Sequence, residues 1–171
     1  MTEELELKIV ERFPSLCLNY KGDPHLTCFA FGFECDDGWH DLIYDTFCKL
    51  DFFSEISGVG ITIEQVKEKF GELRVYYKPL DLSLLAENKR KLAWEVVNDI
   101  IGNATTTSKN TCEVCGENGT LCSKGSWFKT LCYNTVRNTE EYKEFIPVSE
   151  WLKTLWATFD KAKENQYKVE K

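Results

Sequence analysis

The chain has 171 residues, of which 43% are hydrophobic and 13% aromatic, and its formal net charge is −7. This length and apolar content are typical of one continuous core, so we expect residues 1–171 to fold as a single domain. The acidic balance argues against nucleic acid as a partner, because neutralising a phosphate backbone needs a dominant basic face.

Signals for membranes and export are also missing from the sequence. There is no apolar run of roughly 18 residues or more, and the acidic first residues do not resemble a signal peptide. We therefore expect a cytoplasmic protein with no membrane partner. Whether it forms a homo-oligomer stays open.

The first third of the chain predicts a helix, a strand and a second helix. Apolar residues spaced by four favour a helix over residues 3–13, which Pro14 stops. Residues 27–34 predict a strand, because Phe29, Phe31 and Phe33 alternate with small residues and so share one face.

The second helix follows an acidic glycine turn at residues 36–38. Its apolar stripe runs over residues 39–50, and Asp36 or Asp37 is placed to cap it.

A hairpin is predicted over residues 61–77, with its turn near residues 69–72, because strand-forming residues flank that turn. The alternative is a helical turn over residues 63–70 that is closed by Gly71.

The second half predicts two further helices around a polar, cysteine-rich region. Helical spacing favours a long helix over residues 83–101, with Asp81 or Ser83 as its cap, followed by a loop at 103–110. A C-terminal helix is expected over residues 149–165. The apolar positions of the long helix are Leu85, Leu92, Val96 and Ile100. The predicted fold class is α+β, a small antiparallel sheet packed by three to four helices with a zinc-knuckle-like cysteine loop.

Eight cysteines are expected to be reduced thiols, since a chain with a sizeable core and no export signal does not need a disulfide scaffold. Four of them lie singly among apolar neighbours, where a free cysteine acts as a small buried hydrophobe. These are Cys17, Cys28, Cys35 and Cys48. The other four lie in a cysteine-rich knuckle over residues 108–136.

The knuckle has the form of a zinc site. Cys112 and Cys115 lie three residues apart before Gly116, and two thiolates on such a tight turn can share a tetrahedral metal. Cys122 and Cys132 complete the predicted ligand set for Zn²⁺. Neither of these two has a Cys or His two or three residues beyond it, so a packed knuckle without metal is the alternative.

A second candidate site is the basic strip around the hairpin turn. Cations beside an aromatic residue and a glycine can hold phosphates while a ring stacks on a base. The predicted ligand-binding residues are Trp39, Lys67, Lys69, Phe70, Arg74 and Tyr76, with Tyr77 and Trp127 as extensions of the platform. The alternative is an ordinary solvated turn with its aromatic residues in the core.

The sequence offers little for catalysis, so we expect a binding protein and not an enzyme. His25 and His40 are the two imidazoles, and no phosphate loop, nucleophile elbow or zinc-protease motif is present. An acidic cluster could hold Mg²⁺ for phosphodiester cleavage, but a capped, solvated helix face is the simpler explanation and the one that we favour. Its members are Asp36, Asp37, Asp41 and Asp45.

Three motifs, taken in order, resemble a group of short bacteriophage and prophage proteins. They are residues 31–39 (FGFECDDGW), 65–74 (QVKEKFGELR) and 112–119 (CEVCGENG), the last followed by 127–132 (WFKTLC). In that group the segment matching residues 130–132 is typically followed closely by another Cys or His, whereas this chain continues YNTV. The resemblance implies a phage setting, and either loss of the metal site or Cys122 as its fourth ligand.

Two functions follow as hypotheses. The first is a phage counter-defence protein in the host cytoplasm, which sequesters a small anionic, nucleotide-derived ligand in a pocket joining Trp39 to the turn at residues 69–74. The second is a zinc-knuckle adaptor that contacts a host protein or nucleic acid through residues 112–132. A metal-dependent phosphodiesterase at the acidic cluster is a further alternative.

Overall fold

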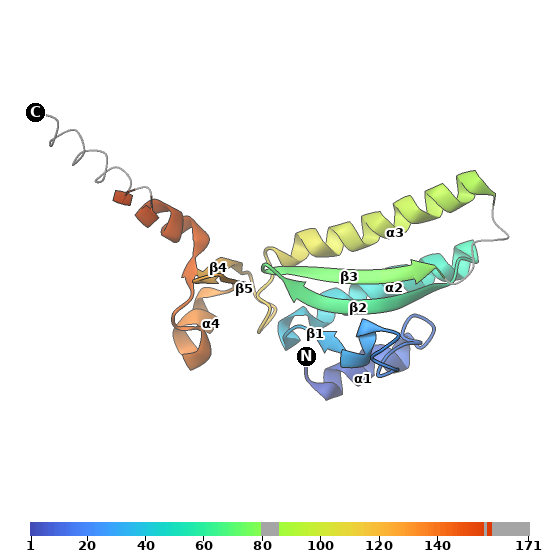
Figure 1. The fold of residues 1–171 in the computed structure, drawn as a ribbon, viewed down its shortest axis with the longest axis horizontal. Helices are drawn as coiled ribbons and strands as arrows, with labels where there is room; N and C mark the ends of the chain where they lie inside the picture. Colours follow the sequence, from blue (N-terminus) through green and yellow to red (C-terminus); the bar gives the residue numbers. More distant parts are fainter. Residues whose placement is uncertain (80–85, 156, 159–171) are drawn as a thin grey trace, which may run out of the picture.

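The secondary structure alternates helices with two small sheets, which confirms the predicted α+β fold (Figure 1). The structure is a computed structural model that describes residues 1–79, 86–155 and 157–158. The helices are α1 (Glu3–Arg12), α2 (His40–Ser57), α3 (Glu87–Ser108) and α4 (Tyr133–Asn138), with short 3₁₀ turns η1 (Cys28–Phe31), η2 (Asp37–Trp39) and η3 (Glu140–Tyr142). The strands are β1 (Phe33–Glu34), β2 (Ile61–Lys69), β3 (Glu72–Pro79), β4 (Thr120–Lys124), β5 (Trp127–Leu131) and β6 (Ile146–Pro147).

The first sheet is built on the predicted hairpin. Strands β2 and β3 pair antiparallel, with Lys67 opposite Arg74, and they turn at Phe70 and Gly71, both of which have positive φ. The alternative of a helical turn is therefore wrong. Strand β1 adds two residues parallel to β2, so the sheet is antiparallel except at this edge.

Helices α1, α2 and α3 enclose the main core with this sheet. Helix α2 packs against α3, and α3 runs along β3, as Figure 1 shows. The largest fully buried side chains are Trp39, Phe13, Phe29, Phe33, Phe47, Ile9, Leu16, Ile43, Leu50, Ile61, Ile63 and Leu73. A second, smaller core lies around Leu131, Tyr142 and Phe145, so the expected single continuous core is in fact two.

The strand predicted over residues 27–34 is wrong except for its last two residues. Thr27 caps η1 by accepting a hydrogen bond from the amide of Phe29, and Gly32 then turns the chain with a φ of 75°. The buried Glu6 carboxylate accepts a 2.9 Å hydrogen bond from the amide of Phe33. The side chain of Phe31 is 62% exposed as a result of this turn.

Helix α3 is longer than predicted and presents a different face to the core. It continues through the polar segment that was expected to be a loop, where threonine hydroxyls donate to carbonyls four residues earlier. Ala93, Val97 and Ala104 are buried, whereas Leu92 is 60% exposed. The predicted caps at Asp81 and Ser83 lie outside the described residues, and so does Leu85.

Neither aspartate caps α2. The N-cap position is Trp39, and no side chain caps it. Asp37 instead accepts a 2.6 Å hydrogen bond from the amide of Thr2, and Asp36 pairs with Lys129.

The last helix is described from residue 148 to 155 and at 157–158. The remainder of the helix predicted over residues 149–165 lies outside the described residues. Within the described part, no helix has the length and apolarity that crossing a bilayer requires.

The scattered cysteines behave mostly as predicted. Cys17 and Cys35 are buried, and burial raises the pKa of each thiol to about 12. Cys48 is half-buried, but Cys28 is exposed in η1, so the expectation of burial is wrong there.

Candidate metal centre and adjoining cleft

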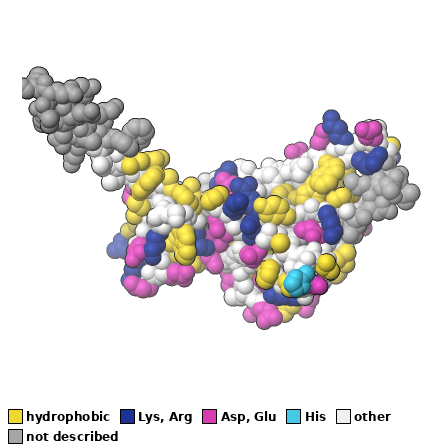
Figure 2. Space-filling model, viewed as in Figure 1, with side chains coloured by type: hydrophobic (Ala, Val, Ile, Leu, Met, Phe, Trp, Pro, Cys, Tyr) yellow, Lys and Arg dark blue, Asp and Glu magenta, His cyan; other side chains and the backbone are white. Residues whose placement is uncertain are grey.

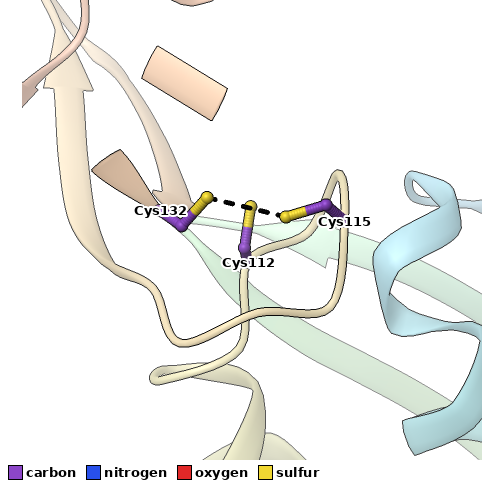
Figure 3. Close-up of side chains that lie close together, drawn as sticks. All are labelled: Cys112, Cys115 and Cys132. Atoms are coloured by element: carbon purple, nitrogen blue, oxygen red, sulfur yellow. Dashed lines mark hydrogen bonds between the residues drawn. The ribbon is translucent and has the colours of Figure 1, made fainter. Parts of the chain in front are cut away.

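Three of the four knuckle cysteines come together. The Sγ atoms of Cys112, Cys115 and Cys132 all lie within 4.8 Å of one another, and those of Cys115 and Cys132 are 3.6 Å apart (Figure 3). Cys112 and Cys132 are buried, and Cys115 is exposed. A cluster of this kind could hold a metal ion.

Two local structures place these thiols. The first is the knuckle turn, where the amide of Gly116, at a φ of 79°, donates a 2.9 Å hydrogen bond to the carbonyl of Cys112. The second is the start of α4, where Cys132 is the N-cap and its Sγ accepts a 3.3 Å hydrogen bond from the amide of Thr135. The β4–β5 hairpin joins the two.

The hydroxyl of Thr135 lies beside all three thiols. Its Oγ1 is 3.4 Å from the Sγ of Cys112, 3.2 Å from that of Cys132 and 3.5 Å from that of Cys115.

The thiols differ in acidity. Burial raises the pKa of Cys132. Hydrogen bonds from the Thr135 hydroxyl and amide and from the other two thiols lower this pKa by more, and the net value is about 7. Burial raises the pKa of Cys115. Cys132 therefore supplies a thiolate more readily than Cys115 near neutral pH.

Cys122 does not join the cluster, which corrects the predicted four-cysteine ligand set. It lies on β4 between Lys129 and Pro147 of the neighbouring strands, where its Sγ donates to the carbonyl of Thr120 at 3.4 Å. Burial raises the pKa of this thiol to about 11. Cys122 is a small buried hydrophobe of the second core.

The knuckle is docked on the turn that precedes α2. The amide of Gly38 donates a 2.7 Å hydrogen bond to the carbonyl of Glu113, and the indole of Trp39 donates a 2.9 Å hydrogen bond to the carbonyl of Thr111. A Cβ on Gly38 would lie 2.5 Å from the amide nitrogen of Cys115 and would also collide with the Cys112 carbonyl. The motifs at residues 31–39 and 112–119 are therefore in direct contact.

A partly buried ion network spans this contact. The Nζ of Lys129 is 2.8 Å from a carboxylate oxygen of Asp36 and 2.8 Å from one of Glu113, which is 1% exposed. Burial raises the pKa of Glu113, and Lys129 opposes this rise. Burial lowers the pKa of Lys129, but the two carboxylates raise it above its ordinary value. The hydroxyl of Tyr142 also donates to Asp36, at 3.3 Å.

The remaining motif, residues 65–74, contacts the β4–β5 hairpin through the turn between β2 and β3. We call residues 112–147, which contain this hairpin and the three clustered cysteines, the cysteine module. The hydroxyl of Thr130 donates a 2.7 Å hydrogen bond to the carbonyl of Gly71, and the Gly71 amide donates to the Glu68 carboxylate at 2.6 Å. The turn of the first sheet and the β4–β5 hairpin are therefore fixed against each other.

A cleft of about 430 Å³ opens between these two hairpins. Phe70 on one wall is 62% exposed, and Trp127 on the other is 72% exposed. In Figure 2, Lys and Arg side chains gather where the two parts of the molecule meet. The cleft is lined by Lys67, Glu68, Lys69, Phe70, Ser126, Trp127, Phe128, Lys129 and Phe145.

The predicted ligand-binding residues are divided among different places. Lys67, Lys69 and Phe70 line the cleft. Arg74 and Tyr76 line a second hollow beside α3, which Lys69 and Phe70 also border. Arg74 is paired with Glu72 at 2.7 Å. Trp39 is fully buried, so the predicted pocket joining it to the hairpin turn is wrong.

Most residues of the second wall are not among those predicted from the sequence. Of its residues, Trp127 alone was included, as an extension of the platform, and Ser126, Phe128 and Phe145 were not. The available signal was the aromatic pair Trp127 and Phe128 directly after the Gly125 turn, a pattern typical of the tip of a hairpin.

The acidic cluster does not form a metal site. Asp36 and Asp37 have the partners described above, and Asp41 pairs with His40 at 2.8 Å. In the described part of the chain, the cysteine trio is the one set of at least three His, Cys, Asp or Glu ligand atoms close enough to share a metal.

Comparisons of the chain with protein-family models, curated proteins and solved structures find no match. The resemblance to phage proteins therefore stays a prediction from the three motifs. The cysteine trio and the cleft are the features that bear on function.

The Gly38→Ala variant tests the docking contact. We expect it to lower the free energy of unfolding by about 1–3 kcal/mol, because the added Cβ meets backbone atoms of the knuckle that cannot move aside cheaply. Urea denaturation measures the change. Gly102→Ala is the matched control: nothing lies within 4 Å of its Cβ in α3, so it should be neutral or stabilising. Equal midpoints for the two variants would contradict the docking contact.

Proposed function

We propose that this protein is a zinc-dependent binding protein that captures a small phosphate-bearing ligand with an aromatic base in the cleft between its two hairpins. One observation carries the proposal: the two walls of one cleft present an exposed aromatic side chain each, Phe70 and Trp127, beside the lysines of β2.

The chemistry of the trio favours zinc. Thiolates are soft ligands that select metals such as Zn²⁺ over Mg²⁺ or Ca²⁺. With Zn–S bonds of about 2.3 Å, a tetrahedral site has sulfurs about 3.8 Å apart. The 3.6 Å between Cys115 and Cys132 is close to this separation. The metal would join the knuckle turn to the start of α4 and so hold the β4–β5 hairpin between them.

The charges in the cleft favour an anionic ligand. No ion pair within 4.0 Å involves Lys67 or Lys69 in the described part of the chain. Lys129 is neutralised by Asp36 and Glu113, and the Glu68 carboxylate accepts the Gly71 amide. Two lysines therefore remain as point charges for a phosphate group.

The aromatic side chains favour a base. Stacking of a base on an aromatic ring contributes about 1–3 kcal/mol, and every nucleobase has a face to stack. A cleft of 430 Å³ also falls within the usual size of small-molecule sites, about 300–1,000 Å³. The net charge of −7 favours a small ligand over a polynucleotide.

Sequestration of a nucleotide-derived host signal during phage infection is the biological role that we propose for this capture. It is supported by the resemblance of the three motifs.

Zinc is tested by metal analysis of the purified chain. We expect about one Zn²⁺ per chain, and a lower melting temperature after removal by a strong chelator, because metal binding is coupled to folding. Cys112→Ser should lose the metal, whereas Cys17→Ser, at a buried thiol outside the trio, should keep it. Metal-free protein with an unchanged melting curve would contradict the zinc proposal.

Ligand capture is tested by calorimetric titration with a panel of nucleoside mono-, di- and triphosphates and cyclic mono- and dinucleotides. For any member that binds, Trp127→Ala should weaken binding by about 1–3 kcal/mol through lost stacking. Lys69→Ala should weaken it through the lost phosphate contact, with little change in stability.

Trp94→Ala and Lys89→Ala are the matched controls, because both residues lie on α3 away from the cleft. They should leave affinity unchanged. Binding that is insensitive to Trp127 and Lys69 would place the ligand elsewhere, and no binding by any member of the panel would contradict nucleotide capture.

A further inference from the structure

We infer that Thr135 is the fourth ligand of the metal centre, so that the site is three thiolates and one hydroxyl. This inference rests on the proposed binding of metal by Cys112, Cys115 and Cys132. It concerns a residue type that zinc-site patterns in sequences do not include.

The position of the hydroxyl is that of a tetrahedral vertex. With Zn–S bonds of about 2.3 Å and a Zn–O bond of about 2.0–2.2 Å, the separation between sulfur and oxygen is about 3.5–3.7 Å. The three separations from Thr135 Oγ1 to the sulfurs are 3.2, 3.4 and 3.5 Å. One oxygen nearly equidistant from three sulfurs completes the fourth corner around a common centre.

The spacing in the sequence agrees with this geometry. Cys132 and Thr135 are three residues apart, as are Cys112 and Cys115. Cys132 is the N-cap of α4, and Thr135 lies in the first turn of that helix. Thr135 therefore occupies the place of the second cysteine in a Cys-x-x-Cys pair.

With reduced thiols, the hydroxyl can donate its proton to one sulfur and accept from two S–H groups. Metal binding deprotonates the cysteines, so those two donors are lost and the hydroxyl can then donate to only one sulfur. A metal ion in the centre would instead bind all three sulfurs and accept a lone pair from the same oxygen. An alcohol oxygen is chemically similar to the water that takes the fourth position in zinc sites with three protein ligands.

No competing ligand lies within the cluster. Among the residues that the structure describes, no further Cys, His, Asp or Glu atom joins the trio. Thr135 is also buried, 6% exposed, which limits the room for water beside it.

Co²⁺ binding to the metal-stripped full chain tests the assignment, because its absorption reports both geometry and the number of thiolates. The wild type should show the bands of a tetrahedral site with three thiolates. Thr135→Cys should raise the thiolate-to-cobalt absorption by about one third, since the number of Co–S bonds rises from three to four. Thr135→Ser should keep the wild-type spectrum.

Thr135→Val should weaken Co²⁺ binding by about tenfold or more and change the visible bands, because the oxygen is lost. Thr46→Val is the matched control, a buried threonine of α2 outside the centre, and it should leave affinity and spectrum unchanged.

Two results would overturn the assignment while leaving the metal proposal intact. The first is a Thr135→Val variant that matches the wild type in Co²⁺ affinity and bands, which is the result expected if water holds the fourth position. The second is a folded Thr135→Cys variant whose absorption stays at the three-thiolate level. A wild-type chain that binds neither Co²⁺ nor Zn²⁺ would overturn both.

Discussion

The contact between the knuckle and the turn before α2 fixes the arrangement of the whole molecule. Gly38 meets the knuckle backbone directly, and Lys129 bridges Asp36 and Glu113 across the same junction. Of these three charged side chains, Glu113 is fully buried, so opening the junction would leave its carboxylate without its lysine partner unless water reached it. The cleft depends on this junction, because one wall belongs to the first sheet and the other to the cysteine module.

The cysteine module has little else to hold it together. Its core consists of six buried side chains, three of them cysteines, and a core of that size rarely supports a fold without a metal or a partner surface. Docking provides the surface, and the proposed metal would provide the internal link between the knuckle and α4. Both supports act on the β4–β5 hairpin, which carries Trp127.

Elements with a strong local pattern could be predicted from the sequence, and those shaped by distant partners could not. The hairpin, α1 and α2 follow from apolar spacing and turn residues. Alternating phenylalanines predict a strand at residues 27–34. The chain forms a 3₁₀ turn there instead, because Thr27 and the buried Glu6 accept hydrogen bonds from the amides of Phe29 and Phe33. For the site, spacing predicts four metal-binding cysteines, of which three come together. The fourth, Cys122, lies in the small core because of its strand register. The sequence predicts a ligand-binding role for Trp39, because no local pattern indicates that its indole donates a hydrogen bond to the carbonyl of Thr111.

Hydrogen exchange of the full chain, with zinc and after chelation, tests most directly whether a metal-supported knuckle holds the two hairpins together. Chelation should speed exchange across residues 112–145 and at the Gly38 amide, which donates to Glu113, while the amides of β2 keep their protection. Equal protection of residues 112–145 and Gly38 with and without metal would contradict the claim that a metal holds the two hairpins together.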